Sequence, residues 1–299
     1  LFLRRLRNQI NIFDNTQFAD QNNTGVEDAV LVFLQGLYQH LDTPRSYVRS
    51  VFIDFSSAFD TIVPYILIDK LLNMNVKPCL VRIIHNFLVD RPQWVKCNNL
   101  NSIIKCLNLG APQGCVISPI LFSLYISDYT ITNNNCSIIK YADDTVITGF
   151  LQGDSSPYVR EVDQFVNWCD RHHLVLNVKK TKEMVFDFRR SSQPLDSLVI
   201  HDQSIERVSE YKYLGTTVDN KLNWNRNTQI VAGKASQRLY LLRKLKEFHV
   251  DNRILVLFYQ SLIQSILTFN FLCTFGNLSK QNRRKLDRPR KIAQRLIYS

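Results

Sequence analysis

Three aspartates stand where carboxylates could do chemistry. Asp54 interrupts a largely apolar run over residues 47–55, and Asp143 and Asp144 separate two further apolar runs. No basic residue is adjacent to Asp54 in the sequence. Burying a carboxylate costs several kcal/mol unless it is paired or binds a metal ion. Two carboxylates at close range repel and share a proton unless a divalent cation lies between them.

Mg²⁺ fits such a pair because it is a hard ion that binds one or two carboxylates together with substrate phosphates. Two such ions can activate a 3′-hydroxyl, stabilise a leaving pyrophosphate and hold the displacement in line. Structural interpretations stay open beside this one. An Asp-Asp pair is ordinary turn chemistry, and an aspartate in a strand can accept a hydrogen bond from a nearby backbone N–H.

The elements predicted around the three acids decide whether they can meet. The apolar run 47–55 predicts a strand, and the runs 137–142 and 145–150 predict a tight hairpin with Asp143 and Asp144 at its tip. If these strands are neighbours, the tip lies beside Asp54. Apolar periodicity predicts helices over residues 25–41, 61–73, 78–89, 118–129 and 157–172, and from residue 227 onward. Further strands are predicted near residues 94–97 and 103–109, within 175–188, and over 198–200 and 211–218.

Charge divides the chain into two parts. The protein has 37 Lys and Arg against 26 Asp and Glu, a net charge of +11, yet residues 1–150 hold 12 of each kind. Residues 221–299 hold 16 basic and 3 acidic residues. We therefore expect an α+β body up to residue 220, followed by a basic helical segment over 221–299. Such a segment suggests a polyanion partner, although a solvated helical surface is the alternative.

Composition excludes several classes of protein. An apolar content of 45% with nine Gly and nine Pro argues against disordered, collagen-like and low-complexity chains. Seven Cys without a CxxC pair argue against a disulfide framework and a zinc site, and reduced cysteines favour an intracellular protein. The nearly apolar run 261–275 is too short and too polar to span a bilayer. The chain begins at Leu1, and we interpret it as an internal piece of a longer reading frame.

At these residues the chain resembles the reverse transcriptase domain of non-LTR (LINE-type) retrotransposons, close to the jockey-like branch, from about residue 17 to the C-terminus. Five motifs in the family's order carry the resemblance. They are Phe52–Asp60 (motif A), Gly110–Pro119 (motif B), Tyr141–Asp144 (motif C, YADD), Leu176–Thr181 (motif D) and Tyr211–Gly215 (primer grip).

The resemblance implies a right-hand polymerase fold of the α+β class. Residues 1–220 would form partial fingers and a palm of antiparallel sheet plus helices, and residues 221–299 a basic helical thumb that grips duplex through its backbone. Asp54, Asp143 and Asp144 would be the catalytic residues and the ligands of two Mg²⁺ ions, with Mn²⁺ as a substitute.

The resemblance also assigns substrate-binding residues, which are Phe55, Phe59, Gln113, Gly114 and Lys180. The Phe59 ring would abut the sugar 2′ position and reject ribonucleotides, since a flat ring leaves no room or partner for a 2′-hydroxyl. Core packing is the alternative for these aromatic rings. Gln113 and Gly114 would admit the template and the incoming nucleotide, where a helix-start turn is the alternative. Lys180 would stand near the triphosphate, where a cation neutralises the leaving pyrophosphate, or would be a solvated charge.

The primer terminus would be supported by Tyr213, Leu214 and Gly215, which by themselves are an ordinary strand end. The implied partners are an RNA template, a DNA primer, the RNA–DNA duplex and dNTPs, with no membrane. The implied activity is RNA-directed DNA synthesis, as in target-primed retrotransposition, acting in the nucleus and the cytoplasm. The resemblance leaves the oligomeric state open.

Three departures from the family pattern favour a truncated copy. Residues 20–26 lack two expected arginines, the fingers residues that hold the triphosphate are absent together with the amino-terminal endonuclease, and Pro289 falls inside a predicted thumb helix, where it should break or kink the helix. One alternative function is therefore a catalytically dead, RNA-binding remnant. A nucleotide cyclase on a related palm is a third hypothesis, which Phe59 and the thumb-like segment disfavour.

Overall fold

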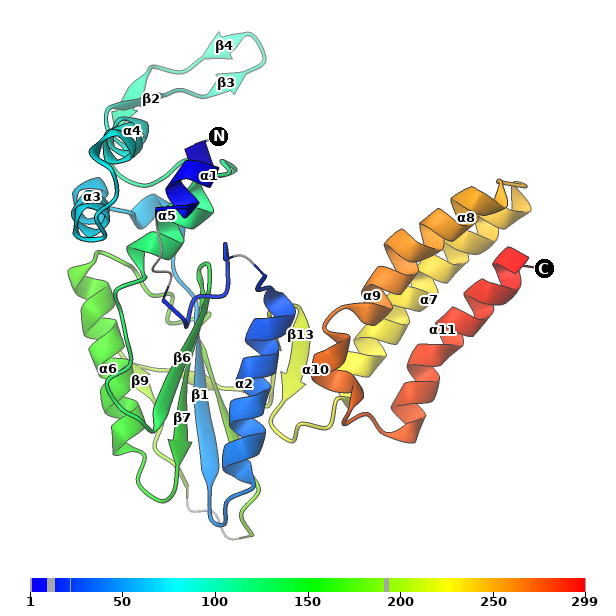
Figure 1. The fold of residues 1–299 in the computed structure, drawn as a ribbon. Helices are drawn as coiled ribbons and strands as arrows, with labels where there is room; N and C mark the ends of the chain where they lie inside the picture. The colour runs from blue at the N-terminus through cyan, green and yellow to red at the C-terminus, as the bar shows by residue number, and fades with distance from the viewer. Residues whose placement is uncertain (1, 10–13, 22, 191–193, 299) are drawn as a thin grey trace.

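The structure is a computed structural model that describes residues 2–9, 14–21, 23–190 and 194–298 (Figure 1). The helices of the α+β body are α1 (Phe2–Arg7), α2 (Val26–Leu41), the 3₁₀ helix η1 (Ala58–Thr61), α3 (Pro64–Asn73), α4 (Pro78–Leu88), α5 (Ser118–Tyr125) and α6 (Ser156–Arg171). Its strands are β1 (Tyr47–Ile53), β2 (Arg91–Gln93), β3 (Lys96–Cys97), β4 (Leu100–Asn101), β5 (Lys105–Leu107), β6 (Cys136–Tyr141), β7 (Asp144–Leu151), β8 (Lys182–Asp187), β9 (Val199–Ile200), β10 (Gln203–Ser204), β11 (Glu206–Arg207), β12 (Glu210–Tyr213) and β13 (Thr216–Asp219).

A five-stranded sheet in the order β11-β8-β1-β7-β6 forms the centre of the body. Strand β1 runs antiparallel to both β7 and β8, and β6 and β7 form the predicted hairpin. The structure thereby confirms the strand predicted over 47–55 and the acidic hairpin beside it.

Side chains of β1 alternate between two faces of the sheet, as the two-residue period of a strand requires. Val48 and Phe52 pack with helix α2, whereas Tyr47, Val51 and Ile53 pack with helices that include α6. Helices α2 and α6 therefore cover opposite faces of the sheet (Figure 1). Both faces of β1 are buried, which explains why this strand has an apolar run instead of a polar–apolar alternation.

The outer edge of β6 is partly covered by the N-terminal segment. Gln17 forms a parallel bridge with Lys140, whose backbone N–H donates to the Thr16 carbonyl and whose carbonyl accepts from Phe18 N–H. The Lys140 ammonium is buried and lies 2.6 Å from Asp14 Oδ2. At the opposite edge, strand β11 is only two residues long and runs parallel to β8.

Two further charged groups of the body are fully buried. Arg49 on β1 pairs with Glu183 on β8 at 2.7 Å, and both side chains have no exposed surface. Arg207 reaches the second oxygen of Glu183 at 3.1 Å, and the Tyr158 hydroxyl lies 3.3 Å from the first. This network satisfies the buried carboxylate, which would otherwise be strongly destabilising.

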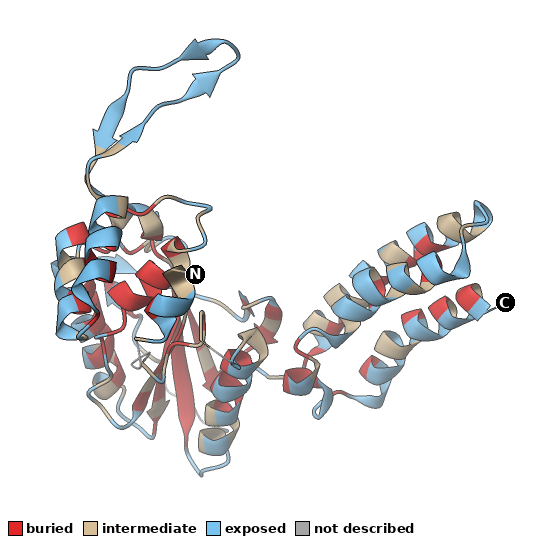
Figure 2. Ribbon diagram, turned by 45° about the horizontal axis from the view of Figure 1, so that its top comes forward, coloured by how far each residue is buried: buried red, intermediate tan, exposed pale blue. Residues whose placement is uncertain are grey.

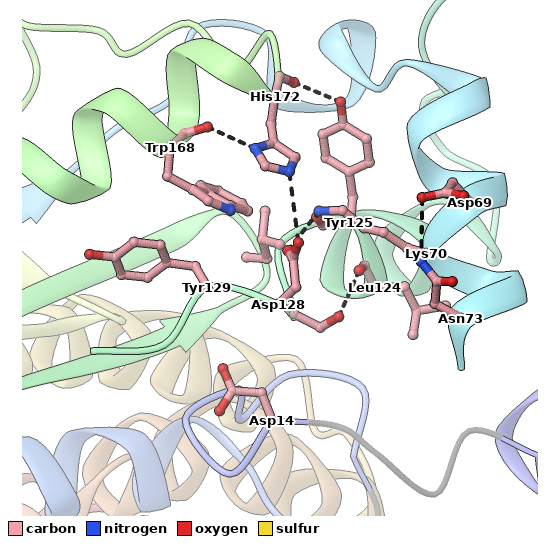
Figure 3. A network of polar contacts seen from close by, with 12 residues as sticks. Asp14, Asp69, Lys70, Asn73, Leu124, Tyr125, Asp128, Tyr129, Trp168 and His172 are labelled. Atoms are coloured by element: carbon pink, nitrogen blue, oxygen red, sulfur yellow. Dashed lines mark hydrogen bonds and ion pairs between the residues drawn. The ribbon is translucent and has the colours of Figure 1, made fainter. Parts of the chain in front are cut away.

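A second polar network joins α3, the segment after α5 and the end of α6 (Figure 3). Lys70 donates to Asp128 Oδ1 at 2.6 Å and to the Tyr125 carbonyl. His172 donates to the Trp168 carbonyl through Nδ1–H (2.8 Å), and its Nε2 lies 3.7 Å from Asp128 Oδ2. Burial lowers the pKa of His172, and the nearby charge of Lys70 lowers it further, against opposing contributions from the Trp168 carbonyl and Asp128.

A long hairpin projects from the body after α4 (Figure 2). Strand β2 pairs with β5 and strand β3 pairs with β4, so the predicted hairpin is confirmed. Its strands differ from the prediction, because β4 lies within the predicted connection 98–102 and β2 lies before residue 94. Its apolar side chains are largely exposed, among them Trp94 and Ile103.

The C-terminal helical segment, residues 221–299, consists of helices around a small core of its own. Its elements are α7 (Asn225–Glu247), α8 (Asn252–Phe258), the π-helix η2 (Tyr259–Gln264), α9 (Ser265–Thr268), α10 (Phe271–Phe275) and α11 (Lys280–Tyr298). Pro289 was predicted to break or kink the last helix, and the break is wrong, because α11 continues through it. Pro289 is buried, and α11 packs along α7 on both sides of it, which compensates for the lost hydrogen bond.

Residues 211–218 also differ from the prediction of one strand. They form an antiparallel hairpin, in which Tyr213 pairs with Thr216 and Leu214 and Gly215 make the turn at positive φ. None of the helices within the described residues combines the length and the apolar character that crossing a membrane requires. All seven cysteines are free thiols.

Candidate active site

Asp54 directly follows strand β1, at the end of the sheet where the β6–β7 hairpin turns. The register pairs Ile53 with Thr145, and each next residue toward this end is an acid, Asp54 on one strand and Asp144 on the other. The hairpin tip is tight, with Ala142 in the left-handed region at φ +53° and Tyr141 paired with Asp144. The fold therefore brings the acids of motifs A and C together.

Backbone contacts hold Asp54 from the side of motif D. Its N–H donates to Thr181 Oγ1 at 3.3 Å, and its carbonyl accepts from Asn177 N–H at 2.8 Å. Its Oδ2 atom is buried and accepts no hydrogen bond from any described group. The closest cation is the Lys180 ammonium at 3.9 Å, on a side chain that is 71% exposed. A buried carboxylate oxygen without a donor is unusual and calls for a ligand from outside the chain.

Asp143 and Asp144 are both exposed residues at the tip. Even so, partial burial of the carboxyl group, together with the charges of Asp143 and Asp54, raises the pKa of Asp144 to about 6. Burial and the charges of Asp144 and Asp54 likewise raise the pKa of Tyr211 to about 12. The neighbouring carboxylates thus raise the pKa of one of their own group, Asp144, and the pKa of the Tyr211 phenol.

These acids fit a divalent cation that is completed by ligands from a substrate. Within the described residues, no set of three His, Cys, Asp or Glu side chains converges tightly enough to hold a metal ion alone. Mg²⁺ does not need such a cage, since it uses one or two carboxylates, waters and phosphate oxygens. The orphaned Asp54 oxygen and the mutual repulsion of Asp54 and Asp144 are what a cation between them would relieve.

The two aromatic residues of motif A differ in exposure. Phe55 is 8% exposed and packs against Phe122 and Phe165 in the core, so its side chain is structural in this state. Phe59 is half-buried, with its ring centroid 5.6 Å from that of Phe122. Of the two rings, Phe59 is therefore the one that retains surface for a ligand.

The motif B turn lies directly on motif A. Gly110 N–H donates to the Ile62 carbonyl and Ala111 N–H to the Phe59 carbonyl, both at 2.8 Å. Gly110 has φ +75°, and a Cβ there would stand 2.8 Å from the backbone of Asp60. Gly114 has φ +79° and open space around it. The turn is therefore fixed at its first glycine and accessible at its second.

Gln113 is exposed, and its amide donates to both carboxylate oxygens of Asp60, at 3.1 and 3.2 Å. Beside this pair lies a cavity of about 770 Å³ whose wall continues into the β2–β5 hairpin through Arg91 and Leu107. Asp60 was not singled out from the sequence, although it ends the motif A run. Its hydrogen-bond partner Gln113 could only be found once motifs A and B were placed together.

The predicted primer-grip residues form the β12–β13 turn. Tyr213 is buried against Phe33 and Phe52, with ring centroids 5.3 and 5.4 Å away, and its hydroxyl has no partner among the described groups. The Leu214 carbonyl accepts a bond from Asn270 Nδ2. Gly215 has φ +82°, and a Cβ there would come within 2.7 Å of the Phe269 ring.

Sequence reasoning also missed Tyr211 as a neighbour of the acids. Its ring stacks on Phe52 with centroids 4.2 Å apart, and its raised pKa records the proximity of Asp144 and Asp54. The signal was present, because Tyr211 is the first residue of the primer-grip motif. What the sequence did not indicate is that the β12–β13 hairpin packs against the end of the sheet where Asp54 and Asp144 lie.

Comparison with protein families gives two matches. Residues 1–218 match the family described as reverse transcriptase (RNA-dependent DNA polymerase). Residues 224–265 match a family described as the N-terminal part of alkylated DNA repair protein alkB homolog 8. The first match contains all five motifs, whereas the second covers only part of the helical segment.

Among curated proteins, the chain is similar to two polymerases of Drosophila melanogaster mobile elements. It is 25% identical over 263 residues to the probable RNA-directed DNA polymerase from transposon BS, covering 82% of this chain and 29% of that protein. It is 26% identical over 256 residues to the RNA-directed DNA polymerase from mobile element jockey, covering 81% and 27%. The chain thus spans less than a third of the length of these relatives.

Among solved structures, the chain resembles telomerase from Candida tropicalis. The apo enzyme matches with a TM-score of 0.50 and 13% identity, covering 99% of this chain and 48% of that one. A form truncated from the C-terminal domain matches with a TM-score of 0.51 and 13% identity, covering 73% and 43%. At this identity the likeness concerns the fold alone, and it confirms the predicted right-hand polymerase fold.

Proposed function

Because the chain belongs to the reverse transcriptase (RNA-dependent DNA polymerase) family, we propose that it extends a DNA 3′-hydroxyl with dNTPs on an RNA template, as in target-primed retrotransposition. One observation carries this proposal. Asp54 presents a buried carboxylate oxygen without a hydrogen-bond donor, next to a hairpin tip where the pKa of Asp144 is raised to about 6. Such a pair is arranged for a cation and a phosphate-bearing substrate.

Asp54, Asp143 and Asp144 would hold two Mg²⁺ ions, with Mn²⁺ as a substitute. When bound, these ions supply activation of the 3′-hydroxyl and charge stabilisation of the pyrophosphate. The chain's part is to fix the carboxylates. Asp54 is held through its backbone by Thr181 and Asn177, and Asp143 and Asp144 are held by the strained tip. Fixed carboxylates need no reorganisation when charge develops in the transition state.

The residues around the acids would orient the two substrates. Lys180 is exposed and 3.9 Å from Asp54, so it can turn toward a triphosphate and offset its charge. Phe59 would exclude the ribose 2′-hydroxyl from its half-buried position, while the buried Phe55 packs against the same Phe122 ring and would bind substrate only indirectly. Gln113 would give up its hydrogen bonds to Asp60 and contact the template instead, beside Gly114, which has open space around it.

Tyr213, Leu214 and Gly215 would hold the primer terminus at the turn that faces Phe269 and Asn270. In this assignment, residues 1–220 are the partial fingers and palm, and residues 221–299 are the thumb. The DNA primer, the RNA template, the RNA–DNA duplex and the dNTPs are the partners we propose. Action in the nucleus and cytoplasm belongs to the same proposal.

The test is extension of a labelled DNA primer on an RNA template with Mg²⁺ and dNTPs. We expect synthesis by the parent chain and none by Asp143→Asn or Asp144→Asn. The matched control is Asp69→Asn, which removes an exposed carboxylate from α3 and should extend like the parent. Replacing dNTPs with ribonucleotides should stop synthesis, and Phe59→Ala should restore part of it.

Two results would count against the proposal. Extension by Asp143→Asn equal to the parent would remove this acid from catalysis. A folded parent that binds RNA but never extends a primer would favour the RNA-binding remnant instead. Folding is checked in each case by circular dichroism, so that an inactive preparation is not mistaken for an inactive protein.

A further inference from the structure

The last helix, α11, carries half of the positive charge of the helical segment. It holds eight of the 16 basic residues of 221–299 and a single acidic residue, Asp287. The eight are Lys280, Arg283, Arg284, Lys285, Arg288, Arg290, Lys291 and Arg295. A concentration of this kind in 19 residues requires an explanation beyond general solubility.

Helical geometry sorts these residues into two faces. The buried residues of α11 are four or seven positions apart, so they share one face and form a seam toward α7: Asn282, Pro289, Ala293 and Ile297. Four cations recur every three or four positions on the opposite side, half a turn away at about 100° per residue: Arg284, Arg288, Lys291 and Arg295. We call these four residues the outer stripe. All four are exposed.

Most of the outer stripe is free to bind a ligand. Within the described residues, Arg284, Arg288 and Arg295 take part in no ion pair or side-chain hydrogen bond, and only Lys291 is paired, with Asp287 at 2.8 Å. The stripe lines a shallow hollow of about 410 Å³. Three of its four charges are thus uncompensated on one open surface, where a polyanion would release counterions on binding.

The outer stripe lies on the side of α11 opposite the seam that packs against α7. Helices α8 and α9 lie on the side of α7 that is turned toward the body, and α11 lies on the other side (Figures 1 and 2). Residues 254–279, which include α9 and α10 and most of α8, contain no charged residue at all. Residues 254–279 therefore add no charge on the side of α7 that is turned toward the body, whereas α11 adds eight cations on the other side.

We propose that the outer stripe of α11 is a second nucleic-acid surface, which holds the sugar–phosphate backbone of an RNA strand outside the polymerase cleft. The choice of RNA as the polyanion rests on the proposed function. The stripe presents one cation per helical turn, which suits a backbone read without sequence specificity. An anionic membrane fits less well, because a membrane-bound helix places large apolar side chains beside its cations, and the apolar seam of α11 is occupied by α7.

The test compares two fourfold variants of the full chain by equilibrium binding of a labelled single-stranded RNA, without Mg²⁺ or dNTPs. The first changes Arg284, Arg288, Lys291 and Arg295 to Gln. The matched control removes the same charge elsewhere, by changing the exposed Arg45, Arg82, Arg160 and Arg171 to Gln. We expect the outer-stripe variant to bind at least roughly tenfold more weakly and its salt dependence to flatten by about 3 units of slope, at about 0.7 per phosphate contact. The control should bind like the parent.

A second arm separates the outer stripe from the cleft. The protein is first saturated with an unlabelled primer–template, and the labelled RNA is then added. We expect RNA to bind this complex, and the outer-stripe variant to lose that binding. A version with Lys at the three arginine positions should keep most of the affinity, because charge and not bidentate geometry is required. Circular dichroism establishes that all variants are folded.

Several outcomes would overturn the inference. These are equal RNA binding by the outer-stripe variant and the parent, equal losses in both fourfold variants, or no binding of RNA to the preloaded protein. Binding of phosphatidylserine vesicles that depends on the stripe, with RNA binding unchanged, would identify a membrane instead. Because none of these measurements needs DNA synthesis, an inactive polymerase would leave the inference testable.

Discussion

The α+β body and the helical segment use charge in opposite ways. The body places charged groups inside, where Arg49 and Glu183 have no exposed surface and Lys140 is 1% exposed. The helical segment keeps a core of seven buried apolar residues and carries 16 cations against 3 acids, including an exposed stripe along α11. Interior charges fix geometry because they must be satisfied, whereas surface charges bind a polyanion and are sensitive to salt.

The difference matches what each part has to do in the proposed function. A metal-dependent transfer needs carboxylates held in place, and Asp54 is held through its own backbone by Thr181 and Asn177, at the end of a sheet that is packed on both faces. Backbone binding needs accessible cations and tolerates looser geometry. We therefore expect substitutions in the body to change rate or stability, and those in the helical segment to change affinity and its salt dependence.

The largest effect should come from Asp54→Asn. The substitution keeps the shape of the side chain but replaces one carboxylate oxygen by an NH2 group and removes the negative charge, so a cation can no longer be held there. We expect primer extension to fall by more than about a thousandfold while RNA affinity is unchanged. Single-turnover extension and RNA binding are measured side by side. Equal losses of extension and of RNA affinity would contradict the assignment of catalysis to the body and of RNA binding to the helical segment.

The next effect concerns the buried ion pair of the body. Glu183→Ala leaves the Arg49 charge buried without its partner, which should lower the free energy of unfolding by about 3–5 kcal/mol. Glu206→Ala is the matched control, because Glu206 pairs with Lys182 at 2.6 Å but is 67% exposed, and it should cost less than about 1 kcal/mol. Urea denaturation measures both. Similar values for the two would mean that the buried network does not fix the sheet.

A smaller effect is expected where the body meets the helical segment. Gly215→Ala forces a side chain into a left-handed position and against the Phe269 ring, which should cost about 1–3 kcal/mol. Gly233→Ala on α7 is a control of opposite sign, since nothing lies within 4 Å of its Cβ position. It should stabilise by about 0.4–1 kcal/mol. The thermal unfolding of the two variants is measured in parallel. An unchanged stability of Gly215→Ala would argue against close packing between the β12–β13 turn and Phe269.

The smallest effect is a pH dependence at the network of Lys70, Asp128 and His172 (Figure 3). Burial lowers the pKa of His172 below its ordinary 6.5, so the folded state favours the neutral ring. The unfolded chain then binds more protons, and the free energy of unfolding should fall as pH drops below 6.5 toward the folded pKa. His172→Gln should reduce this slope, and the exposed His249→Gln should not. Urea midpoints at several pH values measure it.

Much of the body could be predicted from the sequence because its signals are local. An apolar run with one acid predicted β1, and two apolar runs joined by Asp143 and Asp144 predicted the hairpin. The pairing register of two strands about ninety residues apart brings Asp54 and Asp144 together. The sequence predicts that these acids meet only if the two strands are neighbours. The ordered motifs supported the same site through a family resemblance, which the reverse transcriptase match then confirmed for the chain.

Contacts between distant segments could not be predicted. Arg49 lies in a largely apolar strand, and its partner Glu183 is 134 residues away, so no local pattern indicates the pair. Gly215 is a turn signal, yet the sequence predicts a single strand over residues 211–218, where the structure has a hairpin. Pro289 was judged by its cost to an isolated helix, and the packing of α11 along α7 outweighs that cost. The orientation of the outer stripe also depends on which side of α11 is covered.

The N-terminal segment that bridges to Lys140 has a consequence for self-association. An open edge strand offers unpaired N–H and carbonyl groups to the edge of another molecule, which is a common route to aggregation. Here residues 16–18 satisfy both backbone groups of Lys140, and its side chain ties the segment down through Asp14. The far edge, β11, is too short to offer a ladder. A second copy that paired edge to edge with β6 would first have to displace this cover and leave a buried ammonium without its carboxylate.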